Sequence, residues 1–425
     1  MAEQISRNQA SVQAIQDALE ANEIGQLREL LGNLHPSEIA DLLESLPTAV
    51  REELWVHIDS TIEGDVLSKS NAAVRNSLIE NMDPAQVADA TSTLASDDAA
   101  DILQDLPGDL ADEILLSMDG QNRRRVAAVL TYPADTAGGL MSVDTVTVRS
   151  DVEVDVVLRY LRRLGKMPDN LDQLFVVDRA NAFLGVLPLA ELVIAHADAT
   201  TAKIMSTEEL AIPADTLASE VAVVFEQRDL ISAPVVDNQG KLLGRITIDD
   251  VVDVIREESE RSIMSAAGLD EEHDIFAPIL VTARQRALWL ALNLATAFLA
   301  ASVIGLFEAT IEKLVALAVL MPIVASMGGI AGSQTLTIVV RGLALGQIGS
   351  ANARAVLSRE VAVGVLNGCL WAVVVAVAAG AWFDDLRLGV VIGCAMVLNL
   401  LTAGFAGAAI PLLLRRMNID PALAD

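Results

Sequence analysis

The segments LFVVD at residues 174–178 and LGVL at 184–187 recur as APVVD at 233–237 and LGRI at 243–246. Both recur at the same spacing of 59 residues, from 174 to 233 and from 184 to 243. Short runs rich in Val, Ile and Phe between turn-forming residues predict β-strands. We therefore expect two copies of a β-α-β-β-α unit in the middle of the chain.

This double unit resembles a tandem pair of CBS domains, a regulatory module. LMS at residues 140–142 is echoed by IMS at 204–206, so we place the first copy at 139–203 and the second at 204–255. The resemblance implies a module that usually dimerises and often senses nucleotides or ions. The second copy is similar to the ribose-contacting segment of nucleotide-binding CBS domains, with Thr247 and Asp250 in the contacting positions. ATP is therefore a candidate ligand of the pair.

The first 138 residues read as an all-helical domain. Residues 35–47, 83–89 and 96–107 are related copies of one pattern, each opening with a capping residue and placing apolar residues at helical spacing. A proline lies near the end of the first and third of these copies. Such units stack into a short helical solenoid.

The charge and the apolar residues are unevenly distributed. Of the net charge of −29, residues 284–425 carry 9 Lys+Arg and 7 Asp+Glu, or +2, so the first 283 residues carry −31. The last third contains four apolar stretches long enough to cross a bilayer as helices, at about 287–307, 314–340, 361–382 and 388–414. We predict a multi-pass membrane domain at 284–425.

Basic residues at the ends of these spans predict the orientation, because they are retained on the cytoplasmic side. Seven arginines fall on one side of the membrane and two basic residues on the other. The first group is Arg284, Arg286, Arg341, Arg354, Arg359, Arg415 and Arg416, and the second is Lys313 and Arg387. The protein is therefore expected in the cell membrane with its acidic part in the cytoplasm.

Composition also argues against several function classes. The sequence has no phosphate-binding Walker loop, no nucleophile elbow and no paired-cysteine zinc spacing, and its four histidines are scattered. We expect a protein that is not an enzyme. Nucleic acid is a poor partner for a portion at −31, because phosphate binding needs basic patches.

Carboxylates without Cys or His suit hard cations such as Mg²⁺ and Ca²⁺. Asp97 and Asp101 share a helix face, where like charges repel unless a cation binds or solvent screens them. A denser group, Asp249, Asp250 and Asp253, ends the second copy and continues into Glu257 and Glu258 of an acidic connecting helix that we place at 256–283. Either bound cations or water and salt must offset this charge.

The second span carries unusual residues for a membrane helix. Pro322 interrupts its hydrogen bonding, and Gly328, Gly329 and Gln334 follow in mid-span. We expect a break that exposes backbone carbonyls to an ion path, with close helix packing as the alternative. Asn399 of the fourth span is a further polar candidate for the pore lining. Glu360, beside Arg359, is either a salt-bridge partner or a cation site.

Taken in order, these parts resemble the MgtE family of magnesium transporters, which combines a helical N-terminal domain, a CBS pair, a plug helix and a membrane domain. The matching motifs are TYPADTAGGLM at 131–141, segment 244–253, DIFAP at 274–278, segment 321–341, Arg359-Glu360 and DPALA at 420–424. The resemblance implies a homodimer that passes Mg²⁺ and that closes when cytosolic Mg²⁺ binds.

Carried over by motif, the resemblance implies three groups of metal ligands. They are Asp97 and Asp101 in the helical domain, Asp229, Asp250, Asp253 and Glu258 in the CBS pair and plug helix, and Glu360 and Asp420 near the pore mouth.

The chain departs from the family in three places. Ile330 stands where many members have Asn, and Arg261 and Ser262 stand where some have acids. The family has five membrane helices, whereas the sequence as written, ending at Asp425, shows four. We therefore expect it to insert and dimerise without conducting. The alternatives to a transporter are a non-conducting CBS-regulated membrane sensor and a nucleotide-modulated regulatory protein.

Overall fold

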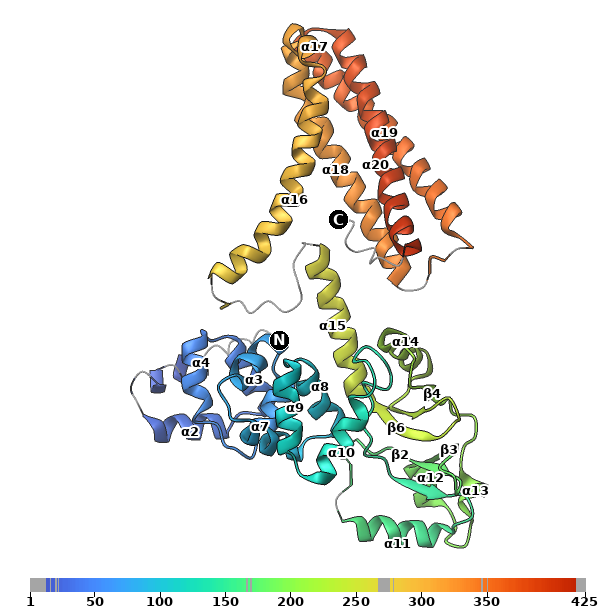
Figure 1. Cartoon of the computed structure of the whole chain (residues 1–425). Helices are drawn as coiled ribbons and strands as arrows, with labels where there is room; N and C mark the ends of the chain where they lie inside the picture. The colour runs from blue at the N-terminus through green and yellow to red at the C-terminus, as the bar shows by residue number, and fades with distance from the viewer. Residues whose placement is uncertain are drawn as a thin grey trace. The chain divides into compact units, whose positions relative to one another are not determined.

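The structure is a computed structural model (Figure 1). It describes residues 13–15, 17–19, 21, 23–165, 167, 168, 170–266, 276, 277, 279–344, 347–349 and 351–417. These residues form two compact units, one built on the chain up to Ser259 and one built mainly on the chain after Pro278. Each unit is described by itself.

The first unit begins with the predicted helical domain. Its elements are α2 (Ile24–Gly32), α3 (Pro36–Glu44), α4 (Thr48–Trp55), α5 (Glu63–Lys69), α6 (Ala72–Ile79), α7 (Pro84–Ala90), the 3₁₀ turn η1 (Thr91–Thr93), α8 (Ser96–Gln104), α9 (Gly108–Ser117) and α10 (Gly120–Val129). Their buried Leu, Ile and Val side chains form one continuous core. The helices are short, so packing on this core rather than intrinsic helix propensity stabilises them.

The three predicted repeat copies correspond to α3, α7 and α8. His35 and Asp83 cap α3 and α7 in capping boxes with Glu38 and Gln86, as the pattern predicts. The third copy differs, because Ser96 is already the first residue of α8 rather than its cap. Its hydroxyl instead accepts a hydrogen bond from the Val143 amide at 2.9 Å.

The repeated β-unit forms two three-stranded sheets. The first has the order β1 (Thr147–Arg149), β2 (Gln173–Val177), β3 (Phe183–Pro188), and the second has the order β4 (Ile212–Pro213), β5 (Ser232–Val236), β6 (Leu242–Thr247). In each sheet the first pair is parallel and the second antiparallel. The helices of the pair are α11 (Val154–Leu164), α12 (Leu189–Ile194), α13 (Thr201–Ile204), α14 (Ala218–Arg228) and the start of α15 (Ile248–Ala266).

The two copies are joined by reciprocal contacts across a pseudo-twofold axis. Ser142 pairs with Arg245 of β6, and its counterpart Ser206 pairs with Val186 of β3. Near the axis, Gln173 Nε2 donates to the carbonyl and to the hydroxyl of Ser232, at 3.1 and 3.0 Å. Each copy is therefore completed by a segment that enters from the other.

The segment that follows the helical domain packs into the second copy. Ala137 and Met141 lie in the core with Val221 and Phe225. The Gly138 and Gly139 backbones lie so close to the 132–134 turn that an added Cβ would fall within 2.4 Å of Tyr132 and 2.3 Å of the Pro133 carbonyl, respectively. The helical domain is thus attached directly to the second CBS copy.

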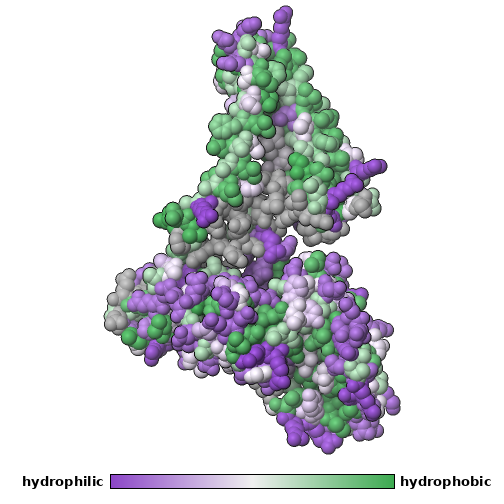
Figure 2. Space-filling model, in the orientation of Figure 1, coloured by the Kyte–Doolittle hydropathy of each residue, from purple (hydrophilic) through white to green (hydrophobic). Residues whose placement is uncertain are grey.

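The second unit contains the four predicted spans. They are α16 (Ile279–Gly305), α18 (Val315–Ala344), α19 (Ala353–Phe383) and α20 (Leu386–Arg416), with the short α17 (Glu308–Lys313) after the first. All four are long and apolar enough to cross a membrane. Figure 2 shows a mostly hydrophobic surface on these helices and a mostly hydrophilic surface on the first unit.

Small residues bring α18, α19 and α20 together. A Cβ on Gly364 would lie 2.7 Å from the Leu400 carbonyl, and one on Gly389 would lie 2.4 Å from the Ala376 carbonyl. Such close approach is the usual basis of helix packing in a bilayer. Arg415 donates to the Ile348 carbonyl at 2.6 Å, which places the end of α20 beside the connection from α18 to α19. Basic residues of three spans therefore share one end, as the charge pattern predicts.

The predicted break in the second span is wrong. α18 is one continuous helix through Pro322, Gly328 and Gly329. Proline removes one helical hydrogen bond, but the rest of the ladder continues and keeps the backbone groups paired. The glycine at 328 serves packing, because an added Cβ there would lie 2.3 Å from the Asn399 side chain.

Candidate cation-binding sites

The start of α8 is fastened to the CBS pair. Besides the Val143 amide, the Ser96 hydroxyl lies 3.3 Å from that of Ser142. Ser142 is paired with Arg245 in β6, and β6 leads directly into α15. These links bring the acidic first turn of α8 close to the acidic first turn of α15, within the first compact unit.

The electrostatics show how closely these turns approach. Asp97 is 6 % exposed, and its burial and the charge of Asp98 raise its pKa to about 7. Burial, then the charges of Asp97 and Asp249, raise the pKa of Asp250 to about 8. The charge of Asp97 therefore acts on Asp250 across the two domains, and ionising both carboxyl groups is unfavourable without a counter-charge.

Asp101 and Asp98 extend this carboxylate cluster. Lost hydration raises the pKa of Asp101, with Arg75 opposing the shift and Asp98 and Asp250 adding to it. Asp101 retains an exposed surface, so water screens its charge better than that of Asp97. Burial likewise raises the pKa of Asp98, which our sequence interpretation did not select. Asp98 follows Asp97 directly, but nothing in the sequence indicates which of these acids faces the CBS pair.

The remaining predicted cytosolic ligands lie near this cluster or beyond it. Asp253 is one turn along α15 and pairs with Lys69 at 3.9 Å and Arg256 at 3.8 Å. Glu258 is exposed further along α15. Asp229 is exposed in a left-handed conformation at the end of α14, two residues before Ile231, whose carbonyl accepts from the Ile248 amide.

One oxygen of the cluster is available for a ligand. Asp97 Oδ1 is buried and has no hydrogen-bond partner among the described residues. Within those residues, no three carboxylate, histidine or cysteine side chains converge on one point as a fully protein-bound metal would require. Mg²⁺ commonly keeps several waters and uses one or two carboxylates, so facing carboxylates fit a hydrated Mg²⁺.

Thr247 and Asp250, the predicted nucleotide contacts, are bonded to each other. Asp250 Oδ2 accepts from the Thr247 amide at 3.1 Å and from its hydroxyl at 2.9 Å. This arrangement caps the start of α15. One carboxylate therefore serves the helix cap and also faces Asp97.

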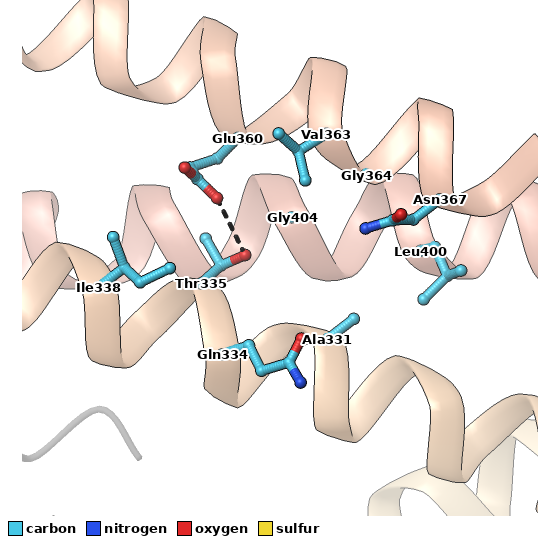
Figure 3. Close-up of a pocket in the computed structure, with 10 residues that line it drawn as sticks. All are labelled: Ala331, Gln334, Thr335, Ile338, Glu360, Val363, Gly364, Asn367, Leu400 and Gly404. Atoms are coloured by element: carbon cyan, nitrogen blue, oxygen red, sulfur yellow. Dashed lines mark hydrogen bonds between the residues drawn. The ribbon is translucent and has the colours of Figure 1, made fainter.

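The membrane unit contains a cavity of about 90 Å³ between α18, α19 and α20, lined by both polar and apolar residues (Figure 3). Glu360 of α19 is 6 % exposed and points toward Thr335 of α18, whose hydroxyl lies 3.4 Å from Glu360 Oε2. In the part of the chain that the structure describes, Glu360 forms no salt bridge, so Arg359 does not neutralise it.

The structure separates the predicted pore residues. Gln334 lines the cavity with Glu360, as do Thr335 and Asn367, which our sequence interpretation missed. Asn399 instead donates to the Val324 carbonyl at 2.6 Å and packs against Gly328. Pro322 and Gly329 are exposed outside this cavity, and Asp420 lies outside the described residues.

Comparison with known proteins identifies the family. The family model described as divalent cation transporter matches residues 321–424, that of the MgtE intracellular N domain matches 34–135, and a CBS domain model matches 202–257. The magnesium transporter MgtE of Thermus thermophilus is 31 % identical over 419 residues, which cover 97 % of this chain and 92 % of the relative. The chain belongs to the MgtE family.

Further similarities agree with this membership. MgtE of Bacillus subtilis is 26 % identical over 96 % of this chain and 90 % of that protein. Among solved structures, the cytosolic domain of the Mg²⁺ channel MgtE in complex with ATP is 30 % identical, with a TM-score of 0.54 over 57 % of this chain and 99 % of that structure. Membership confirms the predicted multidomain architecture and does not favour the non-conducting alternatives.

Proposed function

We propose that this MgtE-family chain is a magnesium transporter of the cell membrane whose pore is controlled by Mg²⁺ bound to its cytosolic part. Mg²⁺ is both the transported substrate and the regulator, and the activity is transport rather than catalysis. The relatives named as magnesium transporters and the membrane-spanning helices support the transport role.

The facing carboxylates of α8 and α15 carry the regulatory part of the proposal. Asp97 and Asp101 of the helical domain approach Asp250 of the second CBS copy, and Asp97 Oδ1 lacks a partner. Mg²⁺ between them offsets their repulsion and favours docking of the two domains. Asp229, Asp253 and Glu258 belong to the same proposed set of ligands. Ion binding at the start of α15 would then change the position or stability of this helix.

In the membrane, Glu360 is proposed as a site for the permeating ion. It is a buried carboxylate on a cavity with Gln334 and Thr335, and an intramembrane acid without a basic partner usually has a functional role. Asp420 is proposed as a second acid near the pore mouth. Gly328 and Asn399 support the helix that carries Gln334.

A second copy of the chain and a nucleotide are the proposed partners, besides the lipid bilayer. Large apolar side chains stay exposed on three CBS helices, namely Val193 and Ile194 of α12, Val223 of α14, and Val252 and Ile255 of α15. Exposed apolar patches mark interaction surfaces, which fits a homodimer formed through the CBS pair. The relative solved with ATP supports nucleotide binding at Thr247 and Asp250.

The transport proposal is tested by Mg²⁺ uptake into liposomes that contain the purified protein and a Mg²⁺-sensitive dye. Uptake that saturates with Mg²⁺ and falls at least tenfold in Glu360→Gln supports it. The control is Glu308→Gln, an exposed acid at the start of α17. Uptake by the parent no faster than by empty liposomes would contradict transport, and equal uptake by Glu360→Gln would exclude only the Glu360 site.

A further inference from the structure

Lys69 joins the helical domain to the second CBS copy. It is the last residue of α5, which packs against α8. Its Nζ lies 3.9 Å from Oδ2 of Asp253 on α15. The two residues are 184 positions apart, from 69 to 253. This ion pair therefore joins two domains at a point distant in sequence from both residues' covalent connection.

Lys69 also acts on the helical-domain side of the carboxylate cluster. Burial raises the pKa of Asp98, and the positive charge of Lys69 is the strongest influence that opposes this rise. Asp249, Asp253 and Asp65 raise it further. The ammonium group of Lys69 therefore sits among carboxylates from α5, α8 and α15.

Arginines near the cluster also make ion pairs, and Arg256 shares Asp253 with Lys69 from within α15. Arg75 pairs with Asp105 inside the helical domain. Arg125 pairs with Asp144, only 19 residues further along, beside the covalent connection between the domains. The Lys69–Asp253 ion pair, by contrast, bridges α15 and the helical domain.

We propose that Lys69 is a built-in counter-ion of the carboxylate cluster, which holds the helical domain on the second CBS copy when Mg²⁺ is scarce and so sets the Mg²⁺ concentration at which the two dock. This inference rests on the proposed regulation by Mg²⁺. Six acids lie in the first two turns of these helices, three in α8 (Asp97, Asp98, Asp101) and three in α15 (Asp249, Asp250, Asp253). The Lys69 ammonium, together with Arg75 and Arg256, offsets part of their repulsion, and Mg²⁺ offsets more of it.

The size of the effect follows from the geometry of the pair. Both side chains are 45 % exposed, and half-exposed ion pairs at this distance are weak. We expect Lys69→Gln to lower the equilibrium constant for docking of the two domains, measured without Mg²⁺, by about two- to fivefold. The variant lacks one positive charge, so bound Mg²⁺ must neutralise more of the carboxylate charge. Docking of the variant should therefore depend more steeply on Mg²⁺ concentration.

The experiment is hydrogen exchange of the full chain in detergent, followed by mass spectrometry of peptides from α8 and from the start of α15. Without Mg²⁺, Lys69→Gln should exchange about two- to fivefold faster than the parent in both peptides. At saturating Mg²⁺ the two proteins should exchange alike. Lys69→Arg should behave as the parent, and so should the control Lys241→Gln, which alters an exposed lysine in the β5–β6 turn.

Two results would overturn the role of Lys69. Equal exchange of Lys69→Gln and the parent without Mg²⁺ would show that the ion pair contributes nothing. A difference that persists unchanged at saturating Mg²⁺ would show that the lysine only packs. Exchange in the parent that ignores Mg²⁺ would instead contradict the proposed regulation, and the metal-free comparison would still decide whether Lys69 holds the domains together.

Discussion

The two CBS copies have the same fold but different surroundings. β2 pairs with β3, and β5 with β6, in the same antiparallel register, with an irregularity at the equivalent step after Val176 and after Val235. After the third strand they diverge, because α12 has 6 residues whereas α15 has 19. The first copy ends in a short helix, and the second continues into a helix that lies against the helical domain.

The equivalent residues of these two helices explain the divergence. Pro188 stands where Thr247 stands in the second copy, so α12 has no side-chain cap. Glu191 corresponds to Asp250 and is exposed, while Ile194 corresponds to Asp253. The buried apolar residues of the strands determine the shared fold. Thr247, Asp250 and Asp253 follow β6 in the copy that we propose to bind a cation, and two of their three counterparts after β3 are Pro188 and Ile194.

The largest effect is expected from removing the facing acids. Asp97→Asn combined with Asp250→Asn should weaken Mg²⁺-dependent protection of α8 and α15, because neither side chain then offers a carboxylate to the ion. We expect the Mg²⁺ midpoint to rise roughly tenfold or more, about 1.4 kcal/mol. Hydrogen exchange at increasing Mg²⁺ measures it. The matched change in the first copy, Glu191→Gln, should leave the Mg²⁺ midpoint unchanged. A shifted midpoint in Glu191→Gln would contradict the assignment of Mg²⁺ binding to the second copy alone.

Protons should compete with Mg²⁺ for the second copy. The pKa of Asp97 is raised from 3.8 to about 7 and that of Asp250 to about 8, so the docked state retains protons that the separated state loses. Docking without metal is then strongest below about pH 4 and weakens as pH rises toward 8. Calorimetry in buffers of different ionisation enthalpy should show about one proton released per Mg²⁺ bound near pH 7. If the double variant Asp97→Asn/Asp250→Asn releases as many protons as the parent, the protons come from other groups.

The contact between the copies should matter for stability and not for ion binding. Gln173→Leu removes both hydrogen bonds to Ser232 and leaves a buried carbonyl unpaired, at a cost of about 1–3 kcal/mol. Hydrogen exchange in β2 and β5 should accelerate accordingly, whereas the Mg²⁺ midpoint stays the same. Gln227→Leu, an exposed position on α14, provides the control. A large change in the midpoint would mean that the two copies communicate through this contact.

The smallest effect is expected at the cap that distinguishes the copies. Thr247→Val removes the hydroxyl bonded to Asp250 and should destabilise the first turn of α15 by about 1 kcal/mol. Faster exchange limited to residues 248–253 would support this, and Thr93→Val in the exposed 3₁₀ turn should have no such effect. Unchanged exchange would show that the backbone bond to Asp250 alone caps the helix.

The sequence predicted the fold well where a regular pattern is repeated. The 59-residue spacing predicted both sheets, and the apolar length predicted four spans, because both signals come from burial. It failed at Pro322, where a local rule predicted a break and the surrounding helix kept the chain helical. It failed also at Ser96, whose hydroxyl bonds another domain rather than its own helix.

The site was predicted only in part, because facing residues are distant in sequence. Asp97 and Asp250 were selected by motif, and the structure places them near enough for the charge of Asp97 to act on Asp250. Asp98 and Lys69 were not selected, since a solvated acid and a cluster acid look alike in the sequence. Asn399 was assigned to the pore lining, yet its amide bonds the Val324 carbonyl and supports helix packing.

The segment from Thr136 to Ser142 acts as a short tether between the helical domain and the second CBS copy. Its first part is fixed in the core of the second CBS copy, only a few residues after α10 ends at Val129. The helical domain therefore never has to find α15 by free diffusion, and its effective concentration there is on the order of millimolar. With so little search entropy to overcome, even the weak binding of hydrated Mg²⁺ that we propose would be enough to determine whether α8 rests on α15. A short tether therefore suits a weak and rapidly reversible sensor.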